Sequence, residues 1–324
     1  QAMANAVVGD DVIDVDPTVE ELQHEVARLL GKEQAVFMPS GSMTNQVGIR
    51  VHCKPGDEFL CDTNCHIFNY EQGAFAQLSG VVARTVDGHQ GVLSLDQLQH
   101  LIRPSNDHLT RTRLVCLENT HNRGGGKILP FDEMTAICQW ARENGLSTHL
   151  DGARLFNAVV ATGISAERWS AGFDTVSVCF SKGLGAPVGS ALAGSADFIR
   201  EARRARKLFG GGMRQAGVLA AGAIHALEHH RERLVDDHEH AKMLGDACQA
   251  SGMLEIRGGR VDSNILICEL DAKWGTADSL VEKLEQRGVR CMSISTQAIR
   301  FVTHLDVSRD QVESACETIG SLIA

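Results

Sequence analysis

A lysine and an aspartate stand where apolar stretches of this sequence end. Lys182 follows the run TVSVCF (175–180) and precedes a loop of glycine and proline, and Asp151 ends the run STHLD (147–151). A lysine amine desolvated at such a position can form a Schiff base with an aldehyde, although a lysine that reaches out to water fits the same pattern. Because a buried carboxylate is costly without a cationic partner, Asp151 predicts a positive group nearby. Arg154 is either its ion-pair partner or a second contact to a common ligand.

The turn Ser40-Gly41-Ser42-Met43 adds a third chemical feature, because it joins the apolar run AVFM (35–38) to a helical stretch. Backbone N–H groups and the positive end of a helix dipole at such a turn suit a phosphate, although a plain helix cap explains it equally well. A phosphate cradle, a carboxylate that faces a pyridinium nitrogen and a Schiff-base lysine, in this chain order, are the groups that hold pyridoxal 5′-phosphate. Together they predict this cofactor, and the glycines after Lys182 predict a loop that passes close to it.

The elements that must position these groups follow one pattern. A helix begins at Asp16-Pro17 and ends at Gly31. Short continuous apolar strands then alternate with amphipathic helices such as 131–144, which predicts an α/β fold with a mostly parallel sheet covered by helices. Functional groups gather at the carboxyl ends of such strands. The expected strands are 35–38, 59–62, 113–119, 147–151 and 175–180.

The pattern changes after the glycines at 210–212. Residues 214–249 predict one or two long helices, and the runs LEIR, NILICEL, RCMSIS and AIRFVTH predict strands that alternate with helices at 277–287 and 308–322. This texture is typical of a second, smaller α+β domain. We therefore expect an N-terminal arm and helix start (1–20), a large cofactor-binding domain (21–232) and a small C-terminal domain (233–324).

The composition disfavours nucleic-acid and membrane partners. The net charge is -10, and the basic run REARRARK (200–207) is explained by a solvated helix face, with one or two members facing an anion as the alternative. No apolar run is long enough for a membrane span and no signal peptide is present, so we expect a cytoplasmic protein. The ten cysteines include no C-x-x-C pair, which predicts buried free thiols. Cys61, Cys65 and His66 lack a second ligand pair at zinc spacing, so no metal is expected.

The motifs as a set resemble the low-specificity L-threonine aldolase family, whose members are fold-type-I pyridoxal-phosphate enzymes with the aspartate aminotransferase-like fold. The resemblance implies a lyase that cleaves L-threonine or L-allo-threonine to glycine and an aldehyde by a retro-aldol reaction, in threonine catabolism and glycine biosynthesis. It also implies a homotetramer, a dimer of dimers, whose active sites lie at subunit interfaces. The motifs span nearly the whole chain in the family's order: VGDDV (8–12), DPTVEELQ (16–23), PSG (39–41), LENTHN (117–122), HLDGARLFNAVVA (149–161), SKGLGAPVGS (181–190), GGGMRQAG (210–217) and RFVTHLDVSRDQ (300–311).

The resemblance implies a role for individual residues. Lys182 matches the lysine that holds the cofactor, and Asp151 matches the acid that keeps the pyridine nitrogen protonated. His66 matches a histidine stacked on the cofactor, where the sequence without this context indicates a polar core or loop histidine. The base is then His66, His121 or a water. The remaining matches are Gly41, Ser42 and Met43 for the phosphate, Arg154 and Arg300 for the substrate carboxylate, His121 near the substrate hydroxyl, and Lys207 and Arg214 for the phosphate of a neighbouring subunit.

Three departures from the family concern the substrate range. Ile13-Asp14 replaces a Tyr-Gly pair, a short Ser-Asp-Thr segment at the start of the family is lacking, and the loop RGGGK (123–127) is richer in glycine. The alternatives are a β-eliminating lyase or aminotransferase with the same lysine and aspartate, an aldolase that prefers L-phenylserine, and a nucleotide-binding α/β module. The last has no support, because no G-x-G-x-x-G follows a strand.

Overall fold

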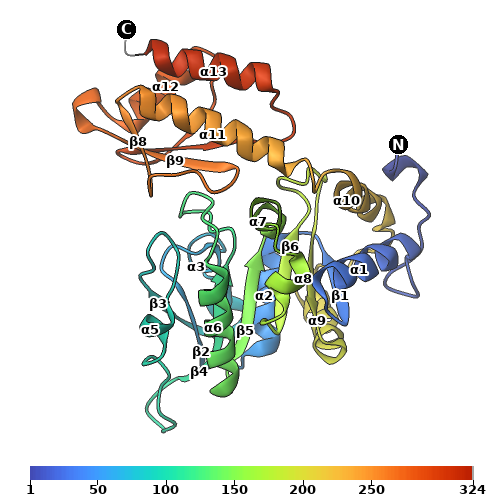
Figure 1. Cartoon of the computed structure of the whole chain (residues 1–324). Coiled ribbons are helices and arrows are strands. Elements are labelled where there is room, and N and C mark those ends of the chain that lie inside the picture. The colour runs from blue at the N-terminus through green and yellow to red at the C-terminus, as the bar shows by residue number, and fades with distance from the viewer. Residues whose placement is uncertain (323–324) are drawn as a thin grey trace.

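The computed structural model describes residues 1–322, and its largest element is a seven-stranded sheet in the order β1-β7-β6-β5-β4-β2-β3 (Figure 1). β2 to β6 pair in parallel, whereas β7 is antiparallel to both of its neighbours. β1 therefore points the same way as β6. The strands are β1 (Gln34–Met38), β2 (Asp57–Asp62), β3 (Val82–Val86), β4 (Arg111–Glu118), β5 (Ser147–Gly152), β6 (Thr175–Cys179) and β7 (Ser190–Gly194).

Helices cover both faces of this sheet, which is why its central strands are buried on both sides. One core joins the sheet to α1, α6, α8 and α10, with Leu22, Phe37 and Trp169 among its fully buried members. The opposite face packs on α2, α4 and α9. The helices are α1 (Pro17–Leu30), α2 (Gly41–His52), α3 (His66–Asn69), α4 (Ala74–Ser79), α5 (Leu95–Leu98), α6 (Phe131–Glu143), α7 (Leu155–Thr162), α8 (Ala166–Ser170), α9 (Ala196–Leu208) and α10 (Gly217–His229), preceded by the short helix η1 (Met3–Asn5).

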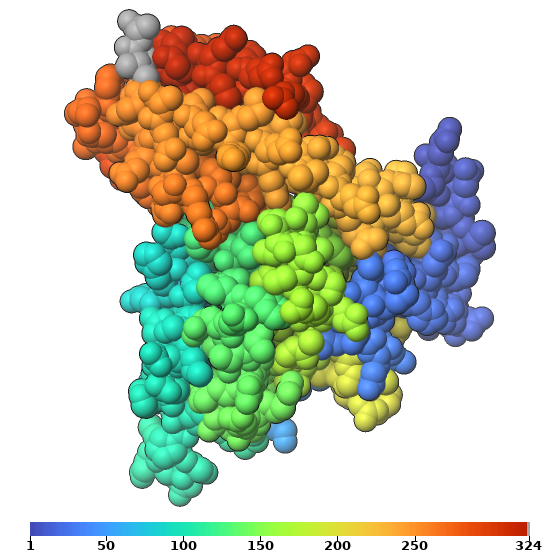
Figure 2. Space-filling model, viewed as in Figure 1, coloured from blue at the N-terminus to red at the C-terminus, as the bar shows by residue number. Residues whose placement is uncertain are grey.

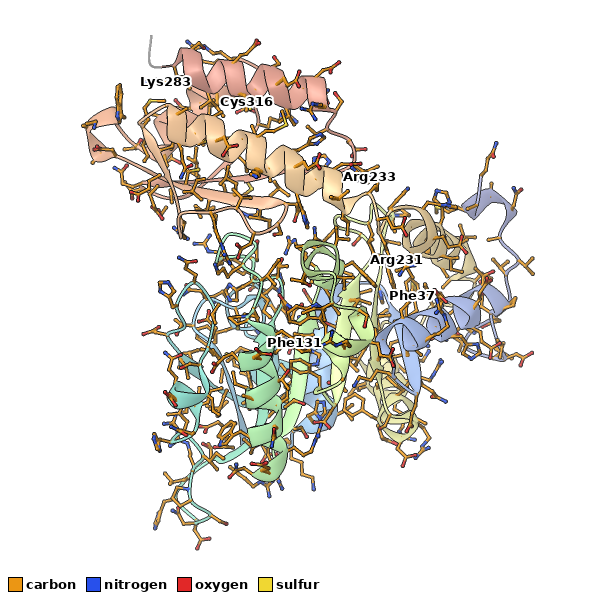
Figure 3. The ribbon with its side chains drawn as sticks, viewed as in Figure 1. Phe37, Phe131, Arg231, Arg233, Lys283 and Cys316 are labelled. Atoms are coloured by element: carbon orange, nitrogen blue, oxygen red, sulfur yellow. The ribbon has the colours of Figure 1, made fainter. Side chains whose placement is uncertain are left out.

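A four-stranded antiparallel sheet in the order β10-β11-β9-β8 forms the smaller unit drawn at the top of Figure 1. Its helices pack on one face around a separate apolar core. The chain enters this unit after α10, where Arg231 and Arg233 lie at the turn into α11 (Figure 3). The elements are α11 (Leu234–Ala250), β8 (Leu254–Ile256), β9 (Ile265–Leu270), the short helix η2 (Ala272–Trp274), α12 (Ala277–Glu285), β10 (Met292–Ser295), β11 (Ala298–Val302) and α13 (Arg309–Ser321).

The glycine-rich loop 123–127 of the larger unit packs against the smaller unit. A Cβ atom on Gly126 would overlap Ser263 and lie 3.0 Å from Ile265 Cβ, and Gly126 has a positive φ of 70°. The loop therefore packs directly on the inner face of the small sheet, and Ser263 Oγ donates to Gly126 O at 2.8 Å. Lys127 and Asp262 add an ion pair of 3.1 Å. This close approach explains Gly126, whereas Gly124 is required because a Cβ atom there would overlap Gln90 O, and Gly125 is favoured by its positive φ of 81°.

The N-terminal segment is fixed by a buried carboxylate. Asp16 caps α1 by accepting from the N–H groups of Thr18 and Val19, both at 3.1 Å. Its other oxygen accepts from Gly9 and from Gly217 of α10, at 3.2 and 2.9 Å. Pro17 at the first turn and the left-handed Gly31 at the end confirm the expected bounds of this helix.

The expected fold class is confirmed: a mostly parallel sheet covered by helices and a smaller α+β unit. Strands β3 and β7 were not expected, and β7 is the antiparallel member of the large sheet. The division at 20/21 and 232/233 stays a prediction. All ten cysteines are free and eight of them are buried. None of the helices within residues 1–322 is both long and apolar enough to cross a membrane.

Candidate active site

Four charged side chains lie at the carboxyl edge of the large sheet, as the parallel topology requires. Asp62 ends β2, Glu118 ends β4, Asp151 stands at the end of β5, and Lys182 follows β6. Glu118 and Asp151 are direct partners in the β4–β5 ladder. Lys182 is close enough to Asp151 for its positive charge to lower the pKa of that carboxyl group. The structure thus brings together the lysine and the acid that the sequence pattern singled out.

Asp151 is buried and held as a carboxylate. Burial raises its pKa, but the charges of Lys182 and His66 and a hydrogen bond from Asn45 outweigh burial, so the pKa lies below its ordinary value. Asn45 Nδ2 donates to Asp151 Oδ2 at 2.9 Å, and the N–H of Ala153 donates to Oδ1 at 3.1 Å. The carboxylate can therefore accept a further proton donor, such as a pyridinium N–H, from the open side of the sheet edge.

The loop that carries Lys182 is shaped by close protein contacts. The Gly185 N–H donates to Lys182 O at 2.8 Å, and the Phe180 N–H donates to Gly189 O at 3.0 Å. Gly185 and Gly189 both have positive φ angles, and a Cβ atom on them would overlap Leu305 and Phe37. These glycines are explained by backbone conformation and packing within the chain. The expected approach of the loop to a cofactor stays a prediction.

His66 begins α3 beside this cluster. Its backbone N–H donates to Glu118 Oε2 at 2.6 Å, and its Nδ1 lies 2.9 Å from Glu71 Oε1. The hydrogen bond to Glu71 raises the pKa of His66, against the effect of burial. The imidazole side chain is 29% exposed. With Nδ1 engaged by Glu71, Nε2 is the ring nitrogen left for a ligand or a proton.

Sequence reasoning missed the residues behind His66. Glu71 is buried and accepts hydrogen bonds from the side chains of Asn45, at 2.8 Å, and Gln46. The only sequence signal was an acid one turn beyond a histidine, which is common on protein surfaces. The ligand atoms of His66, Glu71 and Asp151 lie within 4.8 Å of one another. Because the Asn45 amide already donates to both carboxylates, we interpret this group as a hydrogen-bond network, and the expected absence of a metal stays a prediction.

Two arginines at the site have no carboxylate partner among residues 1–322. Arg300, on β11, donates from Nη2 to Asn122 Oδ1 at 3.0 Å, and its buried Nε has no hydrogen-bond partner within the described chain. Burial, and then the charge of Arg154, lowers the pKa of Arg300 to about 10. Burial also lowers the pKa of Arg154, which stands before α7. The charges of Glu118 and Asp151 act on Arg154 from a distance, but neither arginine forms an ion pair within residues 1–322. Two neighbouring cations without ion-pair partners favour binding of an external carboxylate.

The first turn of α2 is suited to a phosphate. Ser40 Oγ accepts from the Met43 N–H at 3.2 Å, and Ser40 O accepts from the Thr44 N–H. The N–H groups of Gly41 and Ser42 have no acceptor within the described chain, and these positions are only half buried. Gly211 lies in the loop after α9, and because it has no Cβ atom this loop can pack against the sulfur of Met43. A helix N-terminus with free N–H groups at the edge of the sheet suits an anion.

His121 lies buried at the same edge. Its Nδ1 accepts from the Gly124 N–H at 3.1 Å, and its Nε2 lies at an ion-pair distance of 3.1 Å from Asp62 Oδ1 without a hydrogen bond of good geometry. A Cβ atom on Gly91 would overlap the imidazole, so the backbone at Gly91 packs closely against the ring. Burial lowers the pKa of His121, but the charges of Glu118 and Asp62 outweigh burial and raise it. Its role near a substrate hydroxyl stays a prediction.

Lys207 and Arg214 lie outside this cluster. Lys207 is exposed near the end of α9, and Arg214 is 57% exposed and pairs with Asp10 at 2.7 Å. Neither contacts the group around Asp151 in this chain, so their expected role toward a neighbouring subunit stays a prediction. A surface hollow of about 580 Å³ lies at the other end of α2, lined by Arg50, Lys54 and Arg204, away from the strand-end charges.

The residues present fit pyridoxal 5′-phosphate. A partly buried lysine, a fixed carboxylate on the neighbouring strand and a helix N-terminus with free N–H groups are three separate contacts that this cofactor needs. No internal partner competes for the Lys182 amine within residues 1–322. The Nε of Arg300, without a partner within residues 1–322, is free for a further ligand contact.

Comparisons with known proteins concern the family of this chain and its fold. A model of a family described as beta-eliminating lyase matches residues 1–272. The low specificity L-threonine aldolase of Escherichia coli K12 is 41% identical over 96% of this chain and 91% of its own length. A threonine aldolase structure from Leishmania major has a TM-score of 0.83 at 20% identity, over 95% of this chain and 90% of that one. A structure of SPT with PLP has a TM-score of 0.75 at 18% identity, over 99% and 81% of the two chains.

Proposed function

Because the chain belongs to the beta-eliminating lyase family, among relatives named low-specificity L-threonine aldolases, we propose that it cleaves L-threonine or L-allo-threonine to glycine and acetaldehyde with pyridoxal 5′-phosphate. The observation that carries the proposal is the sheet edge where Lys182 lies close enough to lower the pKa of Asp151, beside Arg154 and Arg300, which form no ion pair within residues 1–322. Bound pyridoxal phosphate supplies an electron-accepting ring for the electron pair released when the Cα–Cβ bond breaks.

Asp151 acts from behind the cofactor. Its carboxylate is oriented by the Asn45 amide and the Ala153 N–H and kept ionised by nearby positive charges. It can therefore hold a proton on the pyridine nitrogen through a charge-assisted hydrogen bond. The free backbone N–H groups of Gly41 and Ser42 hold the phosphate at the start of α2, and Met43 contributes its N–H if the phosphate displaces Ser40 Oγ as the acceptor.

Arg154 and Arg300 hold the substrate carboxylate between the two domains. Arg154 belongs to the large domain and Arg300 to the small one, so a bound carboxylate contacts both. Fixing the carboxylate at two points orients the bond from Cα to Cβ for cleavage.

His66 takes the proton of the β-hydroxyl group. Nδ1 is held by Glu71, so Nε2 faces the open side and accepts the proton as the Cα–Cβ bond breaks. Glu118 fixes the backbone of His66 and thereby the start of α3. Between the two histidines of the resemblance, His66 is favoured as the base because its side chain is 29% exposed, whereas that of His121 is 1% exposed and its Nε2 lies against Asp62.

The test replaces Lys182 with Ala. Reduction of the cofactor-loaded wild type with borohydride should fix pyridoxal phosphate to the peptide that contains Lys182, as read by mass spectrometry. The Lys182→Ala variant should give no such peptide and should lose threonine cleavage by several orders of magnitude. A Lys32→Ala control removes another partly buried lysine, which donates to Phe173 O at the far end of the sheet, and should keep both properties. Full activity in Lys182→Ala would refute the proposal.

A second candidate is β-elimination with the same cofactor, which the family description favours. Asp151 and Lys182 would serve either reaction. The products separate the two: glycine and an aldehyde from the aldol cleavage, ammonia and a keto acid from elimination. Parallel assays with threonine, allo-threonine and phenylserine would also decide among the aldolase substrates.

We further propose that the protein is a cytoplasmic homotetramer, built as a dimer of dimers, whose sites are completed by a neighbouring subunit. The support is an apolar N-terminal segment that stands out from the body of the molecule (Figure 2), with Val7 70% and Ile13 74% exposed. Arg214 pairs with Asp10 of this segment, and Arg214 and Lys207 would reach the neighbour's phosphate. Sedimentation analysis tests the assembly, and an active monomer would contradict it.

A further inference from the structure

The amide of Asn45 joins the two carboxylates of the site. Its Nδ2 lies 2.9 Å from Asp151 Oδ2 and 2.8 Å from Glu71 Oε1. A carboxylate only accepts hydrogen bonds, so the amino group of the side chain must face both acids. On the other side, Oδ1 accepts from Ser177 Oγ at 3.0 Å and from His149 Nε2 at 3.1 Å. All four hydrogen-bonding positions of this amide are therefore filled.

The orientation of Asn45 determines the protons of three further buried groups. Because Asn45 Oδ1 is an acceptor, His149 must carry its proton on Nε2. Burial lowers the pKa of His149 to about 4, so the ring is neutral near pH 7 and Nδ1 accepts. The hydroxyl of Thr175, 2.9 Å from that nitrogen, must then be the donor.

The chain of hydrogen bonds ends at His52. Since the Thr175 proton is used toward His149, Thr175 Oγ1 accepts from His52 Nε2 at 2.8 Å. Burial, and then the charge of His149, lowers the pKa of His52 to about 3, so this ring is also neutral. Gly48 leaves room for the His149 ring, since a Cβ atom there would lie 3.1 Å from His149 Cε1. Each proton in this chain of hydrogen bonds therefore has one possible position.

We propose that Asn45 is a positioning residue that fixes the acid behind the cofactor ring and the acid behind His66 as one unit, held in a single orientation by the neutral chain His149–Thr175–His52. If the amide turned over, Oδ1 would face two carboxylates and the amino group would face the proton on His149. Both contacts are repulsive in a buried site, where they cost most. The inference rests on the proposed function only for the identity of the cofactor and the substrate on which Asp151 and His66 act.

The consequence is a coupling between cofactor binding and the base. Asp151 would hold the proton on the pyridine nitrogen of bound pyridoxal phosphate, and Glu71 holds His66 Nδ1. Loss of the Asn45 amino group removes one charge-assisted hydrogen bond from each acid at once. A defect in this residue should therefore affect both cofactor affinity and the catalytic step, although Asn45 acts on each only through another side chain.

The experiment compares Asn45→Ala and Asn45→Asp with an Asn264→Asp control. Asn264 is a buried asparagine outside the site, whose amino group donates to Thr303 O at 2.9 Å, so its replacement tests the cost of disturbing a buried amide alone. Both Asn45 variants should bind pyridoxal phosphate about 10- to 100-fold more weakly than wild type. They should also shift the visible absorbance spectrum of the loaded enzyme and lower kcat more than they raise KM. The control should lose stability while keeping spectrum and affinity.

A second measurement does not require the variants to fold. Nitrogen-15 labelling of histidine in the cofactor-loaded wild type should show His149 and His52 neutral at pH 7 with the proton on Nε2. Wild-type cofactor affinity and spectrum in Asn45→Ala, or a proton on Nδ1 of His149, would overturn the proposal. An enzyme that binds the cofactor but does not cleave threonine would instead refute the proposed reaction, because affinity and imidazole tautomers still report on Asn45.

Discussion

Replacing Arg300 with Gln separates function from stability more sharply than any other change at this site. In the free enzyme Arg300 has one protein contact through Nη2, to Asn122, and an unpartnered Nε, and it stands close enough to Arg154 for that charge to lower its pKa. Removing this cation relieves a repulsion and removes no ion pair. We therefore expect the free energy of unfolding without substrate to stay the same or to increase.

The expected loss of activity follows from the missing contact with the substrate carboxylate. A hydrogen bond to a charged group contributes about 1.5–3 kcal/mol, and about 1.4 kcal/mol corresponds to a factor of ten. Arg300→Gln should therefore lower kcat/KM for threonine about 10- to 150-fold. Most of the loss should be a rise in KM, because the carboxylate contact exists before and after the bond breaks.

Steady-state cleavage of threonine, with the aldehyde measured by a coupled dehydrogenase, gives the rate, and urea denaturation gives the stability. Arg257→Gln is the matched control, because Arg257 also lies between the domains but pairs with Glu269 at 2.6 Å and donates to Arg123 O at 3.2 Å. The control should be slightly less stable with unchanged kcat/KM. An Arg300→Gln enzyme with wild-type kcat/KM, or with a loss of stability that parallels its loss of activity, would refute the reasoning.

Two further predictions concern other buried carboxylates. The hydrogen bond to Glu71 raises the pKa of His66, and a base must be neutral, so kcat/KM should fall as the pH drops through that raised pKa. Glu71→Gln should therefore move the acid limb of the pH–rate profile to lower pH. An unmoved acid limb would exclude His66 as the titrating group. Asp16→Ala removes a fully buried helix cap that accepts four backbone hydrogen bonds, so it should lower the free energy of unfolding by about 3 kcal/mol or more. The control Ser195→Ala removes an exposed helix cap and should lower it by about 1 kcal/mol. Equal losses for the two variants in urea denaturation would contradict the role given to Asp16.

The strand-end residues could be predicted because a parallel sheet orders them. Asp151 and Lys182 follow consecutive strands, and a crossover between neighbouring parallel strands returns the chain to the same edge. The run before Lys182, TVSVCF, is largely apolar, as buried parallel strands require, whereas STHL before Asp151 contains three polar residues and depended on the pattern of the neighbouring strands. The lysine and the acid were therefore identifiable without any tertiary information.

Glu71 and Asn45 could not be found in this way. Glu71 reaches the site because the chain turns sharply after α3, where Gln72 and Gly73 have positive φ angles. Asn45 points to the same place from the opposite side, on a helix whose sequence shows only its apolar face. Their contact depends on how α2 and α3 pack, and no local spacing encodes that packing.

The elements that were missed had weak local signals. β7 consists of the small residues SALAG, and β3 is an edge strand with Arg84 and Thr85 among its residues. The run 200–207 was interpreted as a solvated helix face, which holds for Arg200 and Arg204. Arg206 is instead buried against Phe37 O and Asp11, because one side of α9 faces the sheet.

The pairing of β6 with β7 has a kinetic consequence. The two strands stay paired as far as Cys179 and Ser190, so the segment between them is a short closed loop that carries Lys182. Such a loop costs little chain entropy to close, and its ends stay together while the sheet is intact. Under the proposed function the Lys182 amine is a tethered reactant, whose effective molarity at the cofactor aldehyde far exceeds the concentration of any free amine. The glycine product competes with this tethered amine for the cofactor aldehyde. Because the Lys182 amine does not diffuse away, the competition favours release of glycine.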